Sequence, residues 1–256
     1  MDNNKNSDET IAGQSPPIIS DESIIGRQTD DYKIIEEIGH GGMALVYKAR
    51  QISLDRDVAL KIIPRELIEE PEYVERFKRE ASAAANLNHP NIVSIHGFGR
   101  FRNTYYYLMD LVRGRTLDKI LEEKKHSPVR GSRRFSLNES IRIISQAAAG
   151  LAYAHSRGII HRDIKPGNLF IEDNTNRVLI TDFGLARSVH WEKITPRASL
   201  FGTPAYMSYE QARGNALDFR TDIYSLGAVF YELLTGVEPY KGENALDIIE
   251  KVKTEP

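Results

Sequence analysis

The chain of 256 residues has no cysteine, so neither a disulfide bond nor a zinc site made of thiolates can form. It also has no apolar run of about 18 residues, the length that a membrane-spanning helix needs. The N-terminal sequence MDNNKNSDET is too polar for a secretory signal peptide. These absences predict a cytoplasmic protein with no membrane segment in this chain, and they leave open an anchor further along a longer parent chain.

A strong excess of charge of either sign is absent as well. The net charge is −2 at pH 7, a balance that does not favour nucleic acid or a membrane surface as the main partner. The hydrophobic content of 41% is enough to form a substantial core in a chain of this length. The composition therefore indicates a folded globular protein.

Residues 1–31 differ from the rest of the chain in composition. They are rich in Asn, Ser, Asp and Pro, and they carry seven acidic and two basic residues. Such a segment buries too little apolar surface to offset the entropy lost on folding. We therefore expect a flexible acidic tail over residues 1–31 and a folded domain over residues 32–256. A docking or autophosphorylation segment is the open alternative for the tail.

The stretch at residues 158–184, GIIHRDIKPGNLFIEDNTNRVLITDFG, has polar residues between short apolar runs. The apolar runs predict brief buried strands at residues 159–160, 169–171 and 178–180. The polar residues then lie on the connections between them: Asp163, Lys165, Asn168 and Asp182. This set combines a carboxylate that can accept a hydroxyl proton, a cation, and oxygen ligands of the kind that magnesium prefers. The combination suits phosphoryl transfer.

The sequence HRDIKPGN at residues 161–168, followed by DFG at residues 182–184, resembles the catalytic and metal-binding signature of protein kinases. The resemblance implies a two-lobed α+β fold with a β-rich small lobe over residues 32–110 and a mainly helical large lobe over residues 111–256. It implies that Asp163 is the catalytic base and that Lys165 neutralises the γ-phosphate of ATP. Asn168 and Asp182 would hold Mg²⁺, with Mn²⁺ as an alternative ion.

Residues 39–47 read GHGGMALVY, with three glycines in four positions. Glycines allow a hairpin backbone to approach a phosphate chain closely. By itself the loop is equally compatible with a plain hairpin turn. It resembles the glycine-rich loop of kinases, although Ala44 replaces the usual third glycine and predicts a stiffer loop. By this resemblance the ATP contacts would include Ile38, Gly39, His40, Gly41, Gly42, Met43, Ala44 and Val46. The chain has no G-x-x-x-x-G-K-[ST] motif, which argues against a Walker-type NTPase.

The segment DVALKII at residues 57–63 alternates like a strand and places Lys61 on one face with Ala59. A lysine in such a position most often extends its ammonium group to water. Apolar residues at helical spacing over residues 71–87 predict a helix, and Glu80 lies next to its apolar stripe. Lys61 and Glu80 resemble the lysine and glutamate pair of kinases, in which the lysine binds the α- and β-phosphates and the glutamate orients it.

Residues 104–109, TYYYLM, have the aromatic content of a strand. A core strand followed by a turn is sufficient to account for this segment, and the kinase resemblance implies in addition that the turn binds adenine. The main chain of Asp110 and Val112 would then contact the base, and Met109 would be the gatekeeper. The purine would lie between residues of both lobes: Val46, Ala59 and Phe170.

The residues that follow Asp163, together with Gly202-Thr203-Pro204, resemble the serine/threonine type of kinase, with Thr203 lining the acceptor site. The polar segment at 185–200 offers two phosphorylation sites, Thr195 and Ser199. A phosphate on either could be received by Arg162 and Arg187 and so order the segment, while a plain mobile loop is the alternative. A homodimer is an open arrangement for autophosphorylation.

Two departures from the kinase pattern stand out. Ser208-Tyr209-Glu210 replaces the usual A-P-E, and the last helix expected lies at residues 244–253, so the domain is expected to be incomplete at its C-terminal end. The sequence as a whole predicts a kinase, similar to bacterial eukaryotic-like enzymes, that phosphorylates serine and threonine hydroxyls of proteins. Two alternatives are a pseudokinase or scaffold, and a phosphotransferase acting on a small molecule. The long segment before Thr203 disfavours the second alternative.

Overall fold

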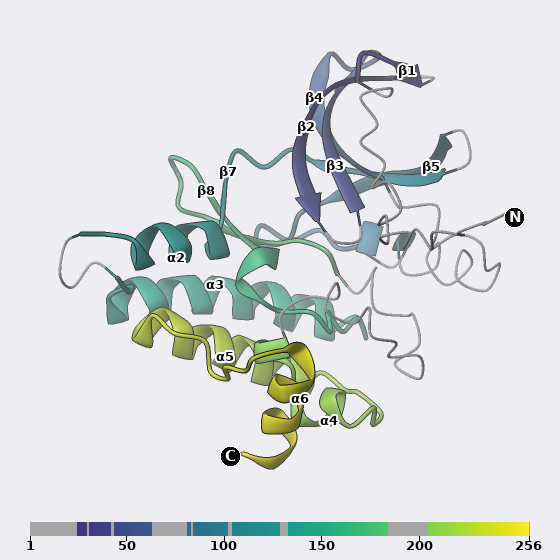
Figure 1. Ribbon diagram of the computed structural model, residues 1–256. Helices are drawn as coiled ribbons and strands as arrows, with labels where there is room; N and C mark the ends of the chain where they lie inside the picture. Colours follow the sequence, from purple (N-terminus) through teal and green to yellow (C-terminus); the bar gives the residue numbers. More distant parts are fainter. Residues whose placement is uncertain are drawn as a thin grey trace, which may run out of the picture.

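The computed structural model describes residues 25–29, 31–41, 44–62, 81–82, 84–101, 104–128, 133–183 and 204–255. Figure 1 shows a curved sheet at one end of the molecule and a group of helices at the other. The smaller part is β-rich and the larger part is mainly helical. This arrangement confirms the predicted two-lobed α+β fold.

The small lobe is built on a six-stranded antiparallel sheet with the strand order β1-β2-β3-β4-β6-β5. The strands are β1 Gln28–Thr29, β2 Tyr32–Gly41, β3 Ala44–Gln51, β4 Arg56–Ile62, β5 Ile95–Phe101 and β6 Thr104–Asp110. The alternation predicted along β4 is confirmed, because Val58, Leu60 and Ile62 lie together in the core of this lobe. Lys61 therefore lies on the opposite face of the sheet.

The sheet begins earlier than the composition predicts. β1 pairs with β2, although its two residues lie in the range 1–31 that the sequence assigns to a flexible tail. The Gly26 N–H donates to the carbonyl of Ile34 at 2.9 Å, and the Asp31 carboxylate accepts the Ser53 N–H at 2.7 Å. A two-residue polar strand has no hydrophobic alternation that a sequence pattern could reveal. The folded lobe thus begins before the predicted boundary at residue 32.

The large lobe combines a three-stranded sheet, in the order β7-β8-β9, with helices. Its elements are β7 Gly114–Thr116, α2 Leu117–Lys125, α3 Leu137–His155, the 3₁₀ turn η2 Pro166–Asn168, β8 Leu169–Glu172, β9 Val178–Ile180, the 3₁₀ turn η5 Pro204–Tyr206, α4 Tyr209–Ala212, α5 Arg220–Thr235 and α6 Ala245–Thr254. One hydrophobic cluster joins α3, α5 and α6 to the three-stranded sheet of this lobe. Among the described residues, no helix has the length and hydrophobicity needed to cross a membrane.

Most of the local signals in the large lobe are confirmed. Ser136 caps α3 through a capping box, which the S-x-x-E sequence of residues 136–139 allows, and the Ser136 N–H donates to the Glu139 carboxylate at 2.8 Å. Asn244 caps α6 by accepting the Asp247 N–H at 3.0 Å. The strands expected at residues 169–171 and 178–180 are β8 and β9. Capping chemistry and short apolar runs are thus sufficient to locate these elements.

The strand expected at residues 159–160 is wrong, because Ile159 and Ile160 form no strand. The Ile159 N–H donates to the carbonyl of Ala154 at the end of α3, at 3.0 Å. The N–H groups of His161 and Arg162 donate to the side-chain carboxylate of Asp222. These three N–H groups are therefore satisfied without a neighbouring strand.

The segment before β5 joins the two lobes. Ile92 forms a parallel bridge with Ile180 of β9, and the Val93 N–H donates to the Ile180 carbonyl at 2.9 Å. The buried side chain of Asn91 donates to the Val178 carbonyl at 2.8 Å. These bonds fix β9, and the residues that follow it, against the base of the small lobe.

Candidate active site

A buried carboxylate holds the backbone that precedes Asp163. Asp222, in the first turn of α5, is fully buried. Its Oδ2 accepts hydrogen bonds from the His161 N–H at 2.8 Å and from His155 Nε2 at 2.7 Å. Its Oδ1 accepts a hydrogen bond from the Arg162 N–H at 2.7 Å. Arg162 has a φ of 67°, in the left-handed region that non-glycine residues seldom adopt. The three hydrogen bonds stabilise this unusual turn and so set the direction in which Asp163 leaves it.

His161 connects the two polar stretches of the site. Its ring is completely buried, lies 4.7 Å from the ring of Phe183, and accepts the Asp163 N–H on Nδ1 at 3.2 Å. Because Nδ1 is an acceptor, the ring proton is on Nε2, which donates to the Thr181 carbonyl at 2.8 Å. The neutral ring thus ties Asp163 to the residue before Asp182.

Asp163, Lys165 and Asn168 form a compact polar cluster. The Lys165 ammonium lies 2.9 Å from Asp163 Oδ2. The Asn168 amide nitrogen donates to the same oxygen at 3.1 Å and to the Asp163 carbonyl at 2.7 Å. Because the nitrogen is engaged in this way, the carbonyl oxygen of Asn168 is the atom left for another ligand. Asn168 is buried, while Asp163 keeps 21% of its side chain exposed, so the cluster is accessible at Asp163.

Lys61 and Asp182 meet across the two lobes. Lys61 comes from β4 and Asp182 follows β9, and the ammonium lies 2.6 Å from Asp182 Oδ1. Burial alone would raise the pKa of Asp182, but the Lys61 ammonium and the Tyr107 hydroxyl outweigh it and lower the pKa below the usual value for aspartate. Asp182 is therefore a carboxylate. The predicted partner of Lys61, Glu80, lies outside the described residues.

The walls predicted for the adenine pocket lie near this ion pair. Ala59 is buried on β4, in register with Met109 of β6, and Val46 is in register with Lys61. Phe170, on β8, belongs to the three-stranded sheet of the large lobe. The strands thus bring the predicted wall residues of the small lobe beside Lys61, although they lie far apart in the sequence.

The connection between the lobes follows β6. The Asp110 N–H donates to the Ser94 carbonyl at 3.0 Å, and its carboxylate accepts a hydrogen bond from His96 at 2.6 Å. Within the described part of the chain, the Val112 N–H has no hydrogen-bond partner. The N–H of Val112 is consequently a backbone group free to meet a base here.

The glycine-rich segment is a hairpin between β2 and β3. Ile38 and Gly39 lie in β2, and a side chain at Gly39 would come within 3.5 Å of Val46. His40 and Gly41 end β2, and Gly41 pairs with Ala44 at the start of β3. Several predicted site residues lie outside the described residues: Gly42, Met43, Glu80, Arg187, Thr195, Ser199 and Thr203.

The protein kinase domain family matches residues 32–255. This chain belongs to the protein kinase domain family. The match includes every described residue of the site, from the β2–β3 hairpin to the Asp222 carboxylate.

Relatives of this kinase domain come from several bacteria. A probable serine/threonine-protein kinase of Clostridium acetobutylicum is 43% identical over 220 residues, which cover 86% of this chain and 32% of that protein. The serine/threonine-protein kinase PrkC of Bacillus subtilis is 41% identical, over 89% of this chain and 34% of that protein. The chain thus spans about a third of the length of these curated relatives. The crystal structure of the PknI kinase domain of Mycobacterium tuberculosis matches this chain with a TM-score of 0.69, over 85% of this chain and 77% of that one, and the two sequences are 27% identical.

Sequence reasoning missed one residue of this site, Tyr107 of β6. Its side chain is buried, and its hydroxyl donates to Asp182 Oδ1 at 3.1 Å. Burial, followed by the nearby Asp182 charge, raises the pKa of Tyr107 well above that of a free tyrosine. The alternation along β6 was a signal that could have found it, because it places Tyr107 on the same face as Met109.

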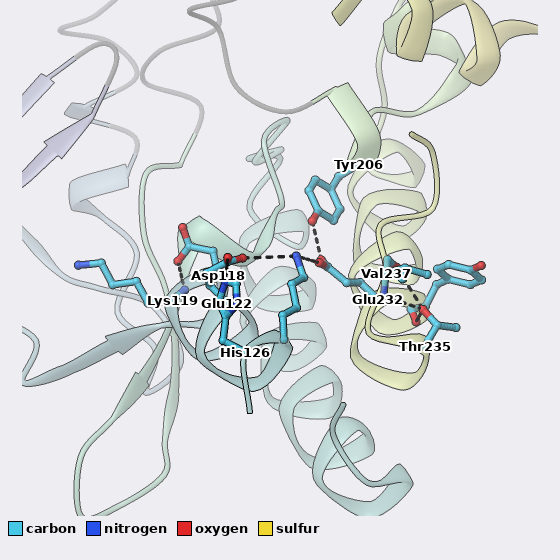
Figure 2. A network of polar contacts seen from close by, with 10 residues as sticks. Asp118, Lys119, Glu122, His126, Tyr206, Glu232, Thr235 and Val237 are labelled. Carbon is cyan, nitrogen blue, oxygen red and sulfur yellow. Dashed lines mark hydrogen bonds and ion pairs between the residues drawn. The ribbon is translucent and has the colours of Figure 1, made fainter. Parts of the chain in front are cut away.

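A second polar network lies in the kinase domain's large lobe, and Figure 2 shows it from close by. The buried carboxylate of Glu232 in α5 accepts the Tyr206 hydroxyl at 2.5 Å and lies 3.5 Å from the Lys125 ammonium of α2. The Lys125 ammonium also lies 3.7 Å from the Glu122 carboxylate, and this carboxylate contacts the ring of His126 as well. The network fixes Tyr206, and with it the turn η5, to the two helices.

The exit turn with its unusual Ser208-Tyr209-Glu210 sequence is well formed. Ser208 caps α4, and its N–H donates to the Gln211 side chain at 3.0 Å. Tyr209 occupies the first helical position, where proline is also favoured because its missing N–H would have no partner. The Gln211 amide donates to the Arg162 carbonyl at 2.7 Å. Replacing proline by tyrosine thus leaves intact the bond from this turn to the residue before Asp163.

Proposed function

We propose that this domain transfers the γ-phosphoryl group of ATP to serine or threonine hydroxyls of protein substrates. The observation that carries the proposal is the meeting of Lys61 and Asp182 from opposite lobes at 2.6 Å, beside the cluster of Asp163, Lys165 and Asn168. The names of the relatives, which are serine/threonine-protein kinases, support the acceptor class. The domain extends, in this proposal, over residues 32–256, with β1 added at its N-terminal edge by its pairing with β2.

The donor atoms fit a nucleotide bound with Mg²⁺. Among the described residues, no group of three or more histidine or acidic side chains could hold a metal alone. Magnesium is commonly held by one or two carboxylates together with substrate phosphates, and Asp182 with the Asn168 carbonyl oxygen would supply the protein ligands. Mn²⁺, which also accepts oxygen ligands, would suit the same atoms. The ion, when bound, neutralises negative charge on the phosphates.

The remaining residues of the site have separate roles in this proposal. Asp163 accepts the proton of the acceptor hydroxyl, and the Asn168 amide orients its carboxylate. Lys165 stabilises negative charge on the transferred group from its position 2.9 Å from Asp163. Lys61 binds the α- and β-phosphates with its ammonium oriented by Glu80. Adenine lies at the connection between the lobes, against Val46, Ala59, Met109, Asp110, Val112 and Phe170, with the β2–β3 hairpin over the phosphates.

The acceptor and regulatory residues complete the proposal. Thr203 lines the acceptor site, close in sequence to the turn η5 that Glu232 fixes. Phosphorylation of Thr195 or Ser199 orders the segment at residues 185–200, because the phosphate binds Arg162 and Arg187. Two copies of the domain phosphorylate each other in a transient homodimer. A pseudokinase or a small-molecule phosphotransferase is less well supported, because the polar groups needed for transfer are present and the relatives are named as protein kinases.

Incubation with Mg²⁺, labelled ATP and a general protein substrate tests the function. We expect label on serine and threonine residues of the substrate and on the domain itself, located by mass spectrometry. Omission of Mg²⁺ should abolish incorporation, since the ion neutralises the transferred phosphate. Label confined to free phosphate, with none on protein, would contradict a protein acceptor.

Binding measurements test whether Asp163 and Asp182 have the different roles proposed for them. Asp182→Asn should weaken Mg²⁺-dependent ATP binding more than Asp163→Asn does, because the substitution removes a proposed metal ligand in the first variant and a proton acceptor in the second. Calorimetric titration of ATP into each variant, with and without Mg²⁺, measures the difference. Equal losses in the two variants would show that the proposed roles are wrong.

A further inference from the structure

Tyr107 lies between the two halves of the site. It is in register with Lys61 across the pairing of β4 and β6, and its side chain is only 1% exposed. The Lys61 ammonium lies 5.9 Å from the centre of the Tyr107 ring, and the Tyr107 hydroxyl donates to Asp182 Oδ1 at 3.1 Å. A core residue of the small lobe thus reaches across to the carboxylate of the large lobe.

The contacts of the Asp182 carboxylate are unevenly shared between its two oxygens. Oδ1 receives the Lys61 ammonium at 2.6 Å, the Tyr107 hydroxyl at 3.1 Å and the Thr181 hydroxyl at 3.3 Å. Within the described residues, no hydrogen bond or ion pair reaches Oδ2. Three contacts on one oxygen fix the rotation of the carboxylate and leave the second oxygen available for a ligand.

The three groups on Oδ1 differ in how firmly they are held. Lys61 has a long flexible side chain whose charge the proposed function also assigns to the phosphates of ATP. Thr181 makes the longest of the three contacts. Tyr107 packs with Ala81 and with the partly buried Ile95, Phe98, Tyr105 and Met109. Because a packed ring has little freedom to rotate, its hydroxyl is the firmest of the three anchors.

We propose that Tyr107 is a positioning residue, which fixes Asp182 through Oδ1 so that Oδ2 faces the metal ion of the bound nucleotide. This inference rests on the proposed function. The three signature motifs of the sequence, HRDIKPGN, DFG and the glycine-rich loop, do not contain this residue. A hydrogen bond of this kind, to the outer side of a metal-binding carboxylate, orients the ligand and tunes its affinity for the ion.

The test is Tyr107→Phe, which keeps the ring and removes the hydroxyl. Loss of an outer partner of a metal ligand typically lowers metal affinity about 10-fold or more, and we expect a loss of about 10-fold in ATP affinity with Mg²⁺. ATP affinity without the ion should be unchanged. Calorimetry with and without Mg²⁺ measures both. The matched control is Tyr106→Phe, since Tyr106 is the next residue on β6 but is buried in the core on the opposite face of the sheet.

Thermal unfolding of both variants separates positioning from a purely structural role. A structural role of the Tyr107 hydroxyl would lower the melting temperature and weaken ATP binding equally with and without Mg²⁺, and that result would overturn the inference. Unchanged Mg²⁺-dependent affinity in Tyr107→Phe, with normal Mg²⁺ dependence in the unmodified domain, would overturn it while leaving the proposed function standing. Absence of any Mg²⁺ dependence in the unmodified domain would overturn both.

Discussion

Asp163→Asn is expected to lower the rate of phosphate transfer by about 100- to 10,000-fold, the usual contribution of a positioned general base. Asparagine has almost the same shape as aspartate but does not accept the proton of an acceptor hydroxyl. The contacts that Lys165 and Asn168 make with Asp163 Oδ2, at 2.9 and 3.1 Å, show that the carboxylate is already oriented within the site. The change therefore removes chemistry while altering the geometry little.

Initial rates of label transfer to a protein substrate measure the effect. The matched control is Asp173→Asn, because Asp173 is an exposed aspartate in the turn between β8 and β9, in the same stretch of sequence. The control should transfer phosphate at the normal rate, and ATP binding should survive in Asp163→Asn. A rate within the range of the control would show that Asp163 is not the base and would direct attention to another proton acceptor.

The parts of the fold that could be predicted from the sequence depend on neighbours in the chain. The capping box of Ser136 and Glu139 and the alternation of Val58 and Leu60 each involve residues a few positions apart. Their physical cause is local, namely the periodicity of helices and strands and the need to satisfy the first N–H groups of a helix. Such signals gave β4, β6, β8, β9 and α6 with small errors at their ends.

The errors arise where the backbone is satisfied by distant groups. Ile159 and Ile160 have the composition of a strand, yet the N–H groups that follow them donate to Asp222 of a helix far along the chain. β1 has no apolar pattern and depends on its pairing with β2. In both cases the partner decides the local structure, and periodicity contains no information about the partner.

The site was predictable to a different degree. Resemblance of motifs pointed to Lys61, Asp163 and Asp182 as site residues without giving their separations in space. The Lys61–Asp182 contact depends on how the lobes pack, through bonds such as that of Val93 to Ile180. Tyr107 was missed because one tyrosine among three in a row reads as an ordinary core residue. Its hydroxyl acquires a role because the fold brings Asp182 to it.

Asp222→Ala is the second substitution with a large expected effect, this time on stability. The change removes the acceptor of three hydrogen bonds, from the His161 N–H, the Arg162 N–H and the His155 ring, at a position that is fully buried. Each buried donor left without a partner costs about 1 to 3 kcal/mol, so we expect a loss of about 3 kcal/mol or more in the free energy of unfolding. A typical domain has about 5 to 15 kcal/mol in all.

Denaturant unfolding of Asp222→Ala, beside Asp218→Ala as control, measures this loss. Asp218 lies four residues earlier, just before α5, and its carboxylate is 47% exposed, pairs with the exposed Arg220 and accepts the Arg220 N–H at 2.9 Å, so its removal should cost about 1 kcal/mol, clearly less than that of Asp222. At temperatures where Asp222→Ala remains folded, phosphate transfer should also fall, because Arg162 loses the bond that holds its left-handed backbone and Asp163 follows directly. Normal stability in Asp222→Ala would mean that water or another group replaces the carboxylate. Normal transfer in a destabilised Asp222→Ala would show that Asp163 keeps its position without it.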